Sequence, residues 1–117
     1  MPTLHVVAEL PQFLRDVAAV GLCDAEHQAI IDAIAADPLQ GDEIRGSGGV
    51  RKIRFAGRGK GKSGGYRVVT VYFGPTVPVY LLALLSKGER ENFTAAEIAA
   101  FKKLTTEIAR YWRRRTT

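Results

Sequence analysis

The sequence has few of the residues that build disulfide frameworks and metal centres. It contains one cysteine, Cys23, and two histidines, His5 and His27, which stand far apart along the chain. One cysteine excludes an internal disulfide and suits a reducing cytoplasm. Because no cation neighbours Cys23 in sequence, we expect it to pack as a small hydrophobic side chain. No cysteine or histidine has the spacing of a zinc site, so we predict no metal and treat both histidines as structural.

The chain also lacks a long hydrophobic run. A membrane helix needs about 20 apolar residues, whereas the run Tyr80–Leu85 is short and is flanked by Pro78 and Lys87. We therefore expect no membrane association. With 117 residues and 46% hydrophobic content, the chain is predicted to be a single domain over residues 1–117 with one core.

Basic residues are nearly missing from the first part of the chain. Residues 1–44 contain eight acids and one basic residue, Arg15, whereas residues 45–117 contain 16 basic residues and four acids. No acid lies between Glu43 and Glu89. A basic half of this kind can bind a polyphosphate through Coulomb attraction and counterion release.

Hydrophobic periodicity predicts seven elements in the order β-α-α-β-β-β-α. They cover Leu4–Ala8, Pro11–Val20, Asp24–Asp37, Val50–Phe55, Tyr66–Phe73, Val79–Leu85 and Thr94–Trp112. Asp24 is the expected N-cap of the second helix, and Thr94-Ala-Ala-Glu97 is a capping box for the last one. This order indicates an α+β domain: an antiparallel-rich sheet, an N-terminal helical hairpin and a C-terminal helix, with the helices packed on one side.

Glycines concentrate in the basic part of the chain, where eight of the twelve lie between Gly46 and Gly65. The run Gly59–Gly64 fits G-x-G-x-x-G and imitates the end of a P-loop. Both motifs need a helix to follow, but a strand is predicted there, and Ala56 stands where the P-loop needs glycine. Nucleotide binding is therefore not expected. We predict instead that the lysines and arginines of the glycine-rich segment bind phosphate groups of another kind of ligand. The alternative is a solvated hairpin tip.

Three runs of sequence carry a family resemblance. They are GDEIRGSGGVRKIR at 41–54, GKGKSGGYRV at 59–68 and YLLALLSKGERENF at 80–93, followed by the capping-box helix. Together they resemble toxins of the RelE/ParE superfamily, specifically the HigB-like branch of bacterial type II toxin–antitoxin modules. The resemblance covers about Leu4 to Lys103.

The resemblance implies a RelE-like fold and a cytoplasmic ribonuclease that cuts mRNA in the ribosomal A site. It implies no metal or other cofactor, and a cognate antitoxin, the ribosome and mRNA as partners. Matched residue by residue, the family's basic positions fall on Lys52, Arg54, Arg67 and Lys87. The chain departs from RelE-type relatives at Lys87, where they have arginine, and at Phe93, where they have a catalytic tyrosine.

Metal-free RNA cleavage needs cations on the phosphoryl oxygens and groups that move protons. Arginine suits the first task because its guanidinium is bidentate and stays charged. We predict that Arg54 and Arg67 stabilise the transition state, and that Lys62 or Lys87 transfers the proton. Alternatively, Arg67 pairs with an acid of the N-terminal half, and Lys87 is a solvated strand end.

Other residues are predicted to bind RNA without taking part in the chemistry. Lys52, Arg58 and Lys60 would bind backbone phosphate. Tyr66 and Tyr72 could stack on splayed bases or be half-buried sheet residues. Two other functions stay open from the sequence: a non-catalytic RNA- or DNA-binding protein, and a ParE-like topoisomerase poison.

Overall fold

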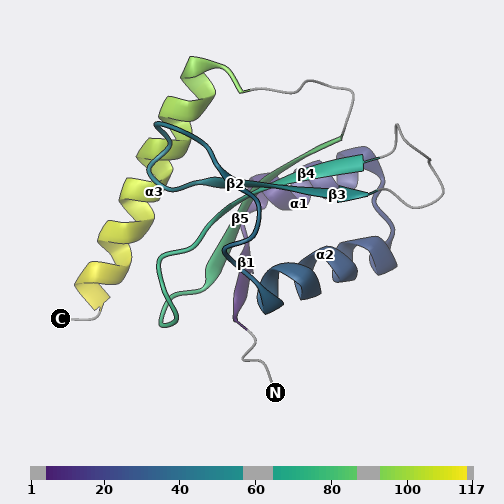
Figure 1. Ribbon diagram of the computed structural model, residues 1–117, viewed down its shortest axis with the longest axis horizontal. Helices are drawn as coiled ribbons and strands as arrows, with labels where there is room; N and C mark the ends of the chain where they lie inside the picture. Colours follow the sequence, from purple (N-terminus) through teal and green to yellow (C-terminus); the bar gives the residue numbers. More distant parts are fainter. Residues whose placement is uncertain (1–4, 57–64, 87–92, 116–117) are drawn as a thin grey trace.

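The computed structural model describes residues 5–56, 65–86 and 93–115. Within them the order is β1 (Val7–Glu9), α1 (Pro11–Val20), α2 (Asp24–Ala36), β2 (Asp42–Glu43), β3 (Arg51–Ala56), β4 (Gly65–Val71), β5 (Val79–Ser86) and α3 (Ala95–Arg115). The strands form one sheet in the order β1-β5-β4-β3-β2 (Figure 1). Only the β1–β5 pair is parallel among them. The predicted α+β class and element order are confirmed, and β2 is an addition.

Strand β2 was not predicted because it is two exposed acidic residues long. Its position comes from Arg51, whose guanidinium donates to the carbonyls of Gln40 at 3.2 Å and Gly41 at 2.9 Å. At Gly41, where φ is +87°, an added Cβ would lie 2.4 Å from the carbonyl oxygen of Lys52. Only glycine lets the chain approach β3 this closely, so Gly41 and Arg51 together bring β2 alongside β3.

Helices α1 and α2 cover one face of the sheet. Even-numbered residues of β4 point to this face, as the two-residue period of a strand requires. Their contacts form a buried cluster made of Phe13, Val17, Ile30, Ile34, Ile53, Val68, Val79, Leu81 and Leu84. Burial of these side chains is the main source of stability of this half of the molecule.

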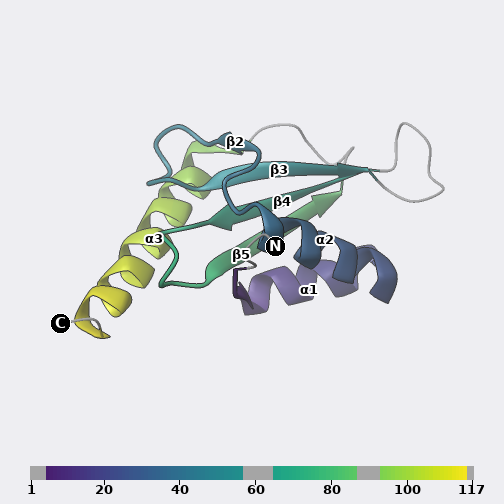
Figure 2. The same ribbon diagram turned by 60° about the horizontal axis from the view of Figure 1, so that its bottom comes forward.

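Helix α3 packs against the opposite face, so the prediction that all helices lie on one side is wrong. Strands of the sheet separate α3 from α1 and α2 (Figure 1, Figure 2). The physical reason is that β4 and β5 are apolar on both faces, and both faces must be covered. The second cluster contains Val50, Val69, Val71 and Leu82, with Phe93, Phe101, Leu104 and Ile108 packed on it.

Two polar contacts hold α3 in place along its length. The buried hydroxyl of Thr105 lies 3.1 Å from the carbonyl oxygen of Ser47, in the turn before β3. Near the helix end, the indole N–H of Trp112 donates to the Tyr80 hydroxyl at 2.7 Å. These contacts fix α3 to the turn and to β5.

The helix starts partly confirm the sequence predictions. The capping box is present: the Thr94 N–H donates to the Glu97 carboxylate at 2.8 Å, and the Glu97 N–H donates to the Thr94 hydroxyl at 3.1 Å. Asp24 is the first residue of α2, while Cys23 occupies the N-cap without capping through its side chain. Cys23 is exposed, so its predicted burial is wrong. Its thiol lies 3.4 Å from the Glu26 carboxylate, a polar partner that replaces apolar packing.

Candidate functional site

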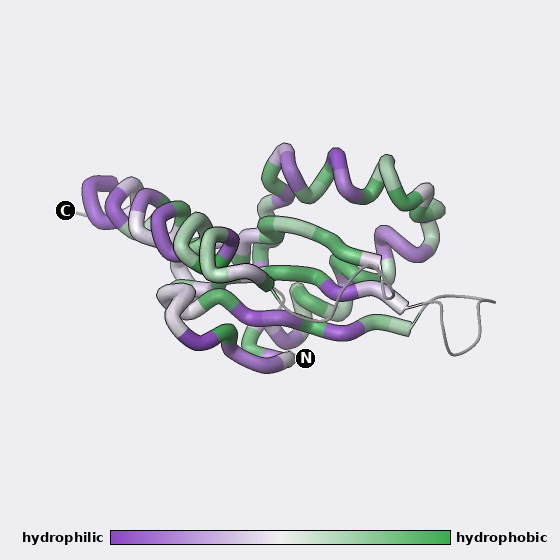
Figure 3. Tube along the Cα trace, turned by 90° about the horizontal axis from the view of Figure 1, so that it is seen from above, coloured by the Kyte–Doolittle hydropathy of each residue, from purple (hydrophilic) through white to green (hydrophobic). Residues whose placement is uncertain are grey.

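Three predicted cations share the α3 face of the sheet. In the β3–β4 ladder Arg54 lies directly opposite Arg67, and Lys52 lies opposite Val69. Ile53 contributes to the α1/α2 cluster, so strand alternation turns Lys52 and Arg54 to the other face. Arg67 shares that face with Val69, which lies in the cluster beneath α3. We call Lys52, Arg54 and Arg67 the cationic triad. Figure 3 shows hydrophilic and hydrophobic residues alternating along β3, the strand that contains Lys52 and Arg54.

The members of the triad differ in burial. Arg54 is exposed and Lys52 is half-buried, whereas Arg67 is only 5% exposed. Like charges on residues directly opposite each other in antiparallel strands are destabilising. An anion placed over the two arginines would remove the repulsion. A phosphate group is one anion that guanidinium groups can bind, through paired charge-assisted hydrogen bonds.

The start of α3 forms a wall beside the triad. Two hollows in the surface share Phe93, which packs edge to face on Phe101 with the ring centres 5.2 Å apart. One hollow is lined by Asp42, Glu43, Ile44, Arg45, Lys52, Phe93 and Ile98. The other is lined by Gln12, Asp16, Ala83, Leu85, Phe93, Glu97, Ala100 and Phe101. Because Leu85 is the β5 partner of Arg67, the second hollow adjoins the triad.

The second hollow contains two carboxylates, those of Asp16 and Glu97, that the sequence did not predict to lie there. Asp16 accepts the backbone N–H of Leu84 at 2.9 Å, and so ties α1 to β5. Glu97 was predicted only as the capping partner of Thr94. The sequence contains no signal for either position, because each depends on which helix packs beside β5.

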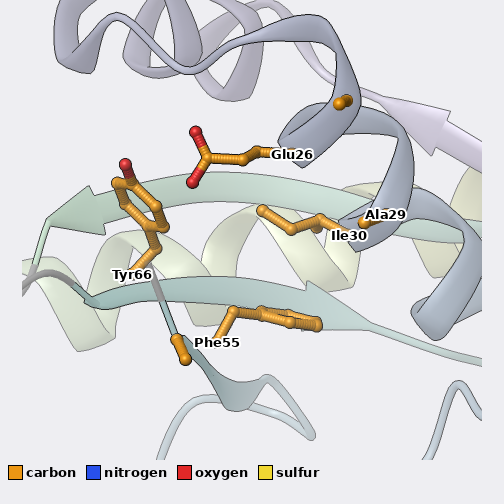
Figure 4. Close-up of a pocket in the computed structure, with 7 residues that line it drawn as sticks. Glu26, Ala29, Ile30, Phe55 and Tyr66 are labelled. Carbon is orange, nitrogen blue, oxygen red and sulfur yellow. The ribbon is translucent and has the colours of Figure 1, made fainter. Parts of the chain in front are cut away.

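Tyr66 lies on the face opposite the triad. It lines a pocket with Glu26, Ile30 and Phe55, and its ring faces the Glu26 carboxylate across that pocket (Figure 4). Burial raises the pKa of the Tyr66 phenol above 10.0, and the charges of Glu26 and Cys23 raise it further. A neutral, half-buried tyrosine here packs between α2 and the sheet.

Tyr72 also belongs to the α1/α2 face. Its hydroxyl lies 3.3 Å from Nδ1 of His5, and the two rings meet edge to face at 5.2 Å. The structure therefore places neither of the two predicted stacking tyrosines beside the triad. Their positions fit the alternative prediction, that they are half-buried residues of the sheet. His27 contacts the Glu9 carboxylate, so both histidines join elements of the fold.

The other predicted site residues, Arg58, Lys60, Lys62 and Lys87, lie outside the described residues. The strand ends that flank them can be placed. Ala56 pairs with Gly65 and Tyr66 pairs with Ser86, so β3, β4 and β5 meet at one end of the sheet. Across residues 5–56, 65–86 and 93–115, no group of histidine, cysteine and acidic side chains could hold a metal ion, and no helix has the length and apolar content to cross a membrane.

The sequence and the fold both match known proteins. A family model described as RelE toxin of RelE / RelB toxin-antitoxin system matches residues 12–116. The chain belongs to the RelE toxin family. A solved structure of the E. coli toxin RelE, an arginine-to-alanine double mutant in the free state, is similar in fold with a TM-score of 0.53 and 17% sequence identity. The match covers 87% of this chain and 97% of that one. Membership of the RelE family identifies the chain as the toxin of a toxin–antitoxin pair and supports RNA cleavage, the activity of that family.

Proposed function

We propose that this RelE-family toxin is a metal-independent endoribonuclease that cuts mRNA in the ribosomal A site. The observation that carries the proposal is the pairing of Arg54 with Arg67 on one face of the sheet, next to Lys52. The resemblance of the sequence to the HigB-like branch is part of the same proposal. The toxin acts in the cytoplasm, and a cognate antitoxin neutralises it.

The reaction is a transfer of the phosphoryl group within the RNA strand. The 2′-oxygen loses its proton and forms a bond to phosphorus, the bond from phosphorus to the 5′-oxygen breaks, and the 5′-oxygen takes up a proton. The products are a 2′,3′-cyclic phosphate and a 5′-hydroxyl. Arg54 and Arg67 neutralise the charge that develops on the phosphoryl oxygens, which is the step that fixed guanidinium groups accelerate most.

Lys52 and the cations of the glycine-rich segment hold the RNA backbone beside the scissile phosphate. Proton transfer falls to Lys62 or Lys87, since nearby cations favour loss of a lysine proton. Phe93 has no hydroxyl, so the tyrosine found at this position in RelE-type relatives has no equivalent here. The ribosome supplies the remaining alignment of the 2′-oxygen with phosphorus.

The same cations give the antitoxin a surface to cover. An acidic segment laid over Arg54 and Lys52 would gain from the charge difference and would block access of RNA. Neutralisation of this kind requires no change in the core of the toxin.

The test is to incubate the purified protein with translating ribosomes and map the mRNA ends. Cuts within codons at the A site that leave a 2′,3′-cyclic phosphate and a 5′-hydroxyl support the proposal. Occupancy of ribosomes without cuts supports a non-catalytic RNA-binding protein, and supercoiling defects with intact mRNA support a topoisomerase poison. The proposal fails if cleavage by Arg54→Ala and by Arg67→Ala both stay within a few fold of the parent.

A further inference from the structure

The outer face of α3 carries a second group of cations, separate from the triad. The helix contains six basic residues and two acidic ones, and all six basic residues are exposed. They are Lys102, Lys103, Arg110, Arg113, Arg114 and Arg115. Figure 3 shows hydrophilic residues recurring along the part of α3 nearest the C-terminus.

Five of these cations lie on one side of the helix. At about 100° per residue, they fall within an arc of roughly 120°. We call this arc the outer stripe; it consists of Lys102, Lys103, Arg110, Arg113 and Arg114. The side chains between them are the short Ala99 and Thr106, and one shallow hollow runs along Ala99, Lys102, Lys103, Thr106, Glu107 and Arg110. Phe101, Leu104 and Ile108 occupy the opposite side of the helix, against the sheet.

The outer stripe stands on a helix that is held at several points. Thr105 bonds to the turn before β3, and Trp112 bonds to Tyr80 of β5. The charges are therefore presented at fixed spacing over roughly 18 Å of helix. A rigid row of cations loses little conformational entropy on binding.

The composition of the stripe selects the kind of partner. It has no aromatic or large aliphatic side chain to anchor a protein interface. Lipid-surface helices need a free apolar face, but here that face is buried against the sheet. Cations separated by small polar or methyl side chains suit a partner that offers regularly spaced negative charge, which is the phosphate backbone of a nucleic acid.

We propose that the outer stripe binds the phosphate backbone of double-helical ribosomal RNA and docks the toxin on the ribosome. A helix can lie on the wide, shallow minor groove of A-form RNA and contact the phosphates that border it. The inference rests on the proposed function in naming ribosomal RNA as the partner. It assigns docking to the outer stripe and leaves chemistry to the triad.

The test compares the parent with the triple variant Lys102→Gln, Lys103→Gln, Arg110→Gln. Glutamine has nearly the helix propensity of lysine and arginine, so the helix is retained. Binding is measured without cleavage, to a fluorescent A-form RNA duplex of arbitrary sequence and to purified vacant ribosomes, over a range of salt concentrations. At about 0.1 M salt the triple variant should bind both probes at least roughly tenfold more weakly, with a salt slope smaller by about 2–3.

The control is Arg115→Gln, which removes a cation from the same helix but outside the stripe. Arg115 lies over the Tyr111 ring, 5.1 Å from its centre. This variant should keep more than half of the parent affinity, whereas Arg110→Gln alone should lose about threefold and about one unit of slope. Equal losses for Arg110→Gln and Arg115→Gln would overturn the inference, because they would reflect net charge and not the stripe. Circular dichroism spectra of each variant check that the helix is retained.

The outcomes separate this inference from the proposed function. A parent that binds ribosomes through the stripe but cuts no mRNA contradicts the proposed function and leaves the docking surface standing. A triple variant with unchanged affinity and salt slope removes the docking surface, even if the parent cuts mRNA. Polyglutamate serves as a third probe that stands in for an acidic protein. If the triple variant loses binding to polyglutamate but binds both RNA probes as tightly as the parent, the inference is also overturned, because the stripe would then serve an acidic protein.

Discussion

The two faces of the sheet differ most where β3 and β4 approach their shared end. Phe55 and Tyr66 point to the α1/α2 face and pack beside α2, while their chain neighbours Arg54 and Arg67 point to the α3 face. The same short stretch of β3 and β4 thus supports apolar packing on one face and a pair of guanidinium groups on the other. One face can be changed without changing the other, because strand alternation separates adjacent side chains.

The largest effect on stability is expected from Ile34, a fully buried residue of α2. Ile34→Ala should lower the free energy of unfolding by about 2–5 kcal/mol through lost burial and the cavity left behind. Denaturant titration measures it. Cleavage per folded molecule should stay near the parent value at low temperature. A selective loss of cleavage in fully folded protein would show that the two faces are coupled.

The largest effect on activity is expected from Arg54, which is exposed. Arg54→Ala should reduce cleavage of ribosome-bound mRNA by about 10²–10³-fold, the usual effect of removing one fixed donor from a transition state. Its unfolding midpoint should change little, because exposed side chains contribute little to stability. Arg15→Ala is the matched control: Arg15 is an exposed arginine of α1 that bonds only to Gln12 in the described contacts. Comparable losses in the two variants would contradict a special role for Arg54.

A substitution at Thr105 tests how much its hydroxyl contributes to the packing of α3 on the sheet. Thr105→Val keeps the shape of the side chain but removes a hydroxyl that lies 3.1 Å from the Ser47 carbonyl oxygen and also contacts the carbonyls of Phe101 and Lys102 in its own helix. The expected loss is about 1–2 kcal/mol of unfolding free energy, the cost of an unpaired buried acceptor. Urea unfolding monitored by the fluorescence of Trp112 reports it. An unchanged midpoint would mean that apolar packing alone positions α3.

At Thr70 the same substitution, threonine to valine, is expected to change stability in the opposite direction. Its side chain is fully buried, and within the described part of the chain its hydroxyl has no hydrogen-bond partner. Thr70→Val should therefore stabilise the protein by about 1 kcal/mol, because the valine methyl group carries no cost of desolvation. The midpoint of denaturation should rise with an unchanged m-value. Destabilisation would indicate a buried water bound to Thr70.

The smallest effect concerns the titration of Tyr66. Its raised pKa means that the folded protein holds the phenolic proton more tightly than the unfolded chain. The resulting stabilisation is complete below pH 10.0, the unfolded value, and is lost as pH rises through the folded value. Tyrosinate absorbance should show a late transition, and Glu26→Gln should move it to lower pH without restoring 10.0, since burial remains the main cause. Asp32→Asn on the same helix should leave the transition unmoved.

Local signals in the sequence predicted much of this structure. The capping box of α3 and the apolar–cationic alternation of β3 depend on neighbouring residues, and both are present. The same two-residue period argues against base stacking by Tyr66 at the triad. Tyr66 and Arg67 are adjacent in one strand, so they cannot face the same ligand.

Long-range packing was beyond the reach of these signals. The parallel pairing of β1 with β5 joins segments far apart in the chain. The side chosen by α3 followed from a feature that the sequence does contain, since β5 reads as apolar on both faces. Two apolar faces need two covers: α1 and α2 occupy the first face, so α3 covers the second. Gly41, which lets the chain approach β3, belongs to no periodic pattern of the sequence.

The parallel pair β1–β5 has a consequence for how the toxin comes into being. Val7 can pair with Val79 only after most of the polypeptide has been translated. At about 5–20 residues per second, the first strand waits roughly 4–14 seconds for its neighbour. A chain that ends before β5 lacks the partner of β1 and cannot form this five-stranded sheet.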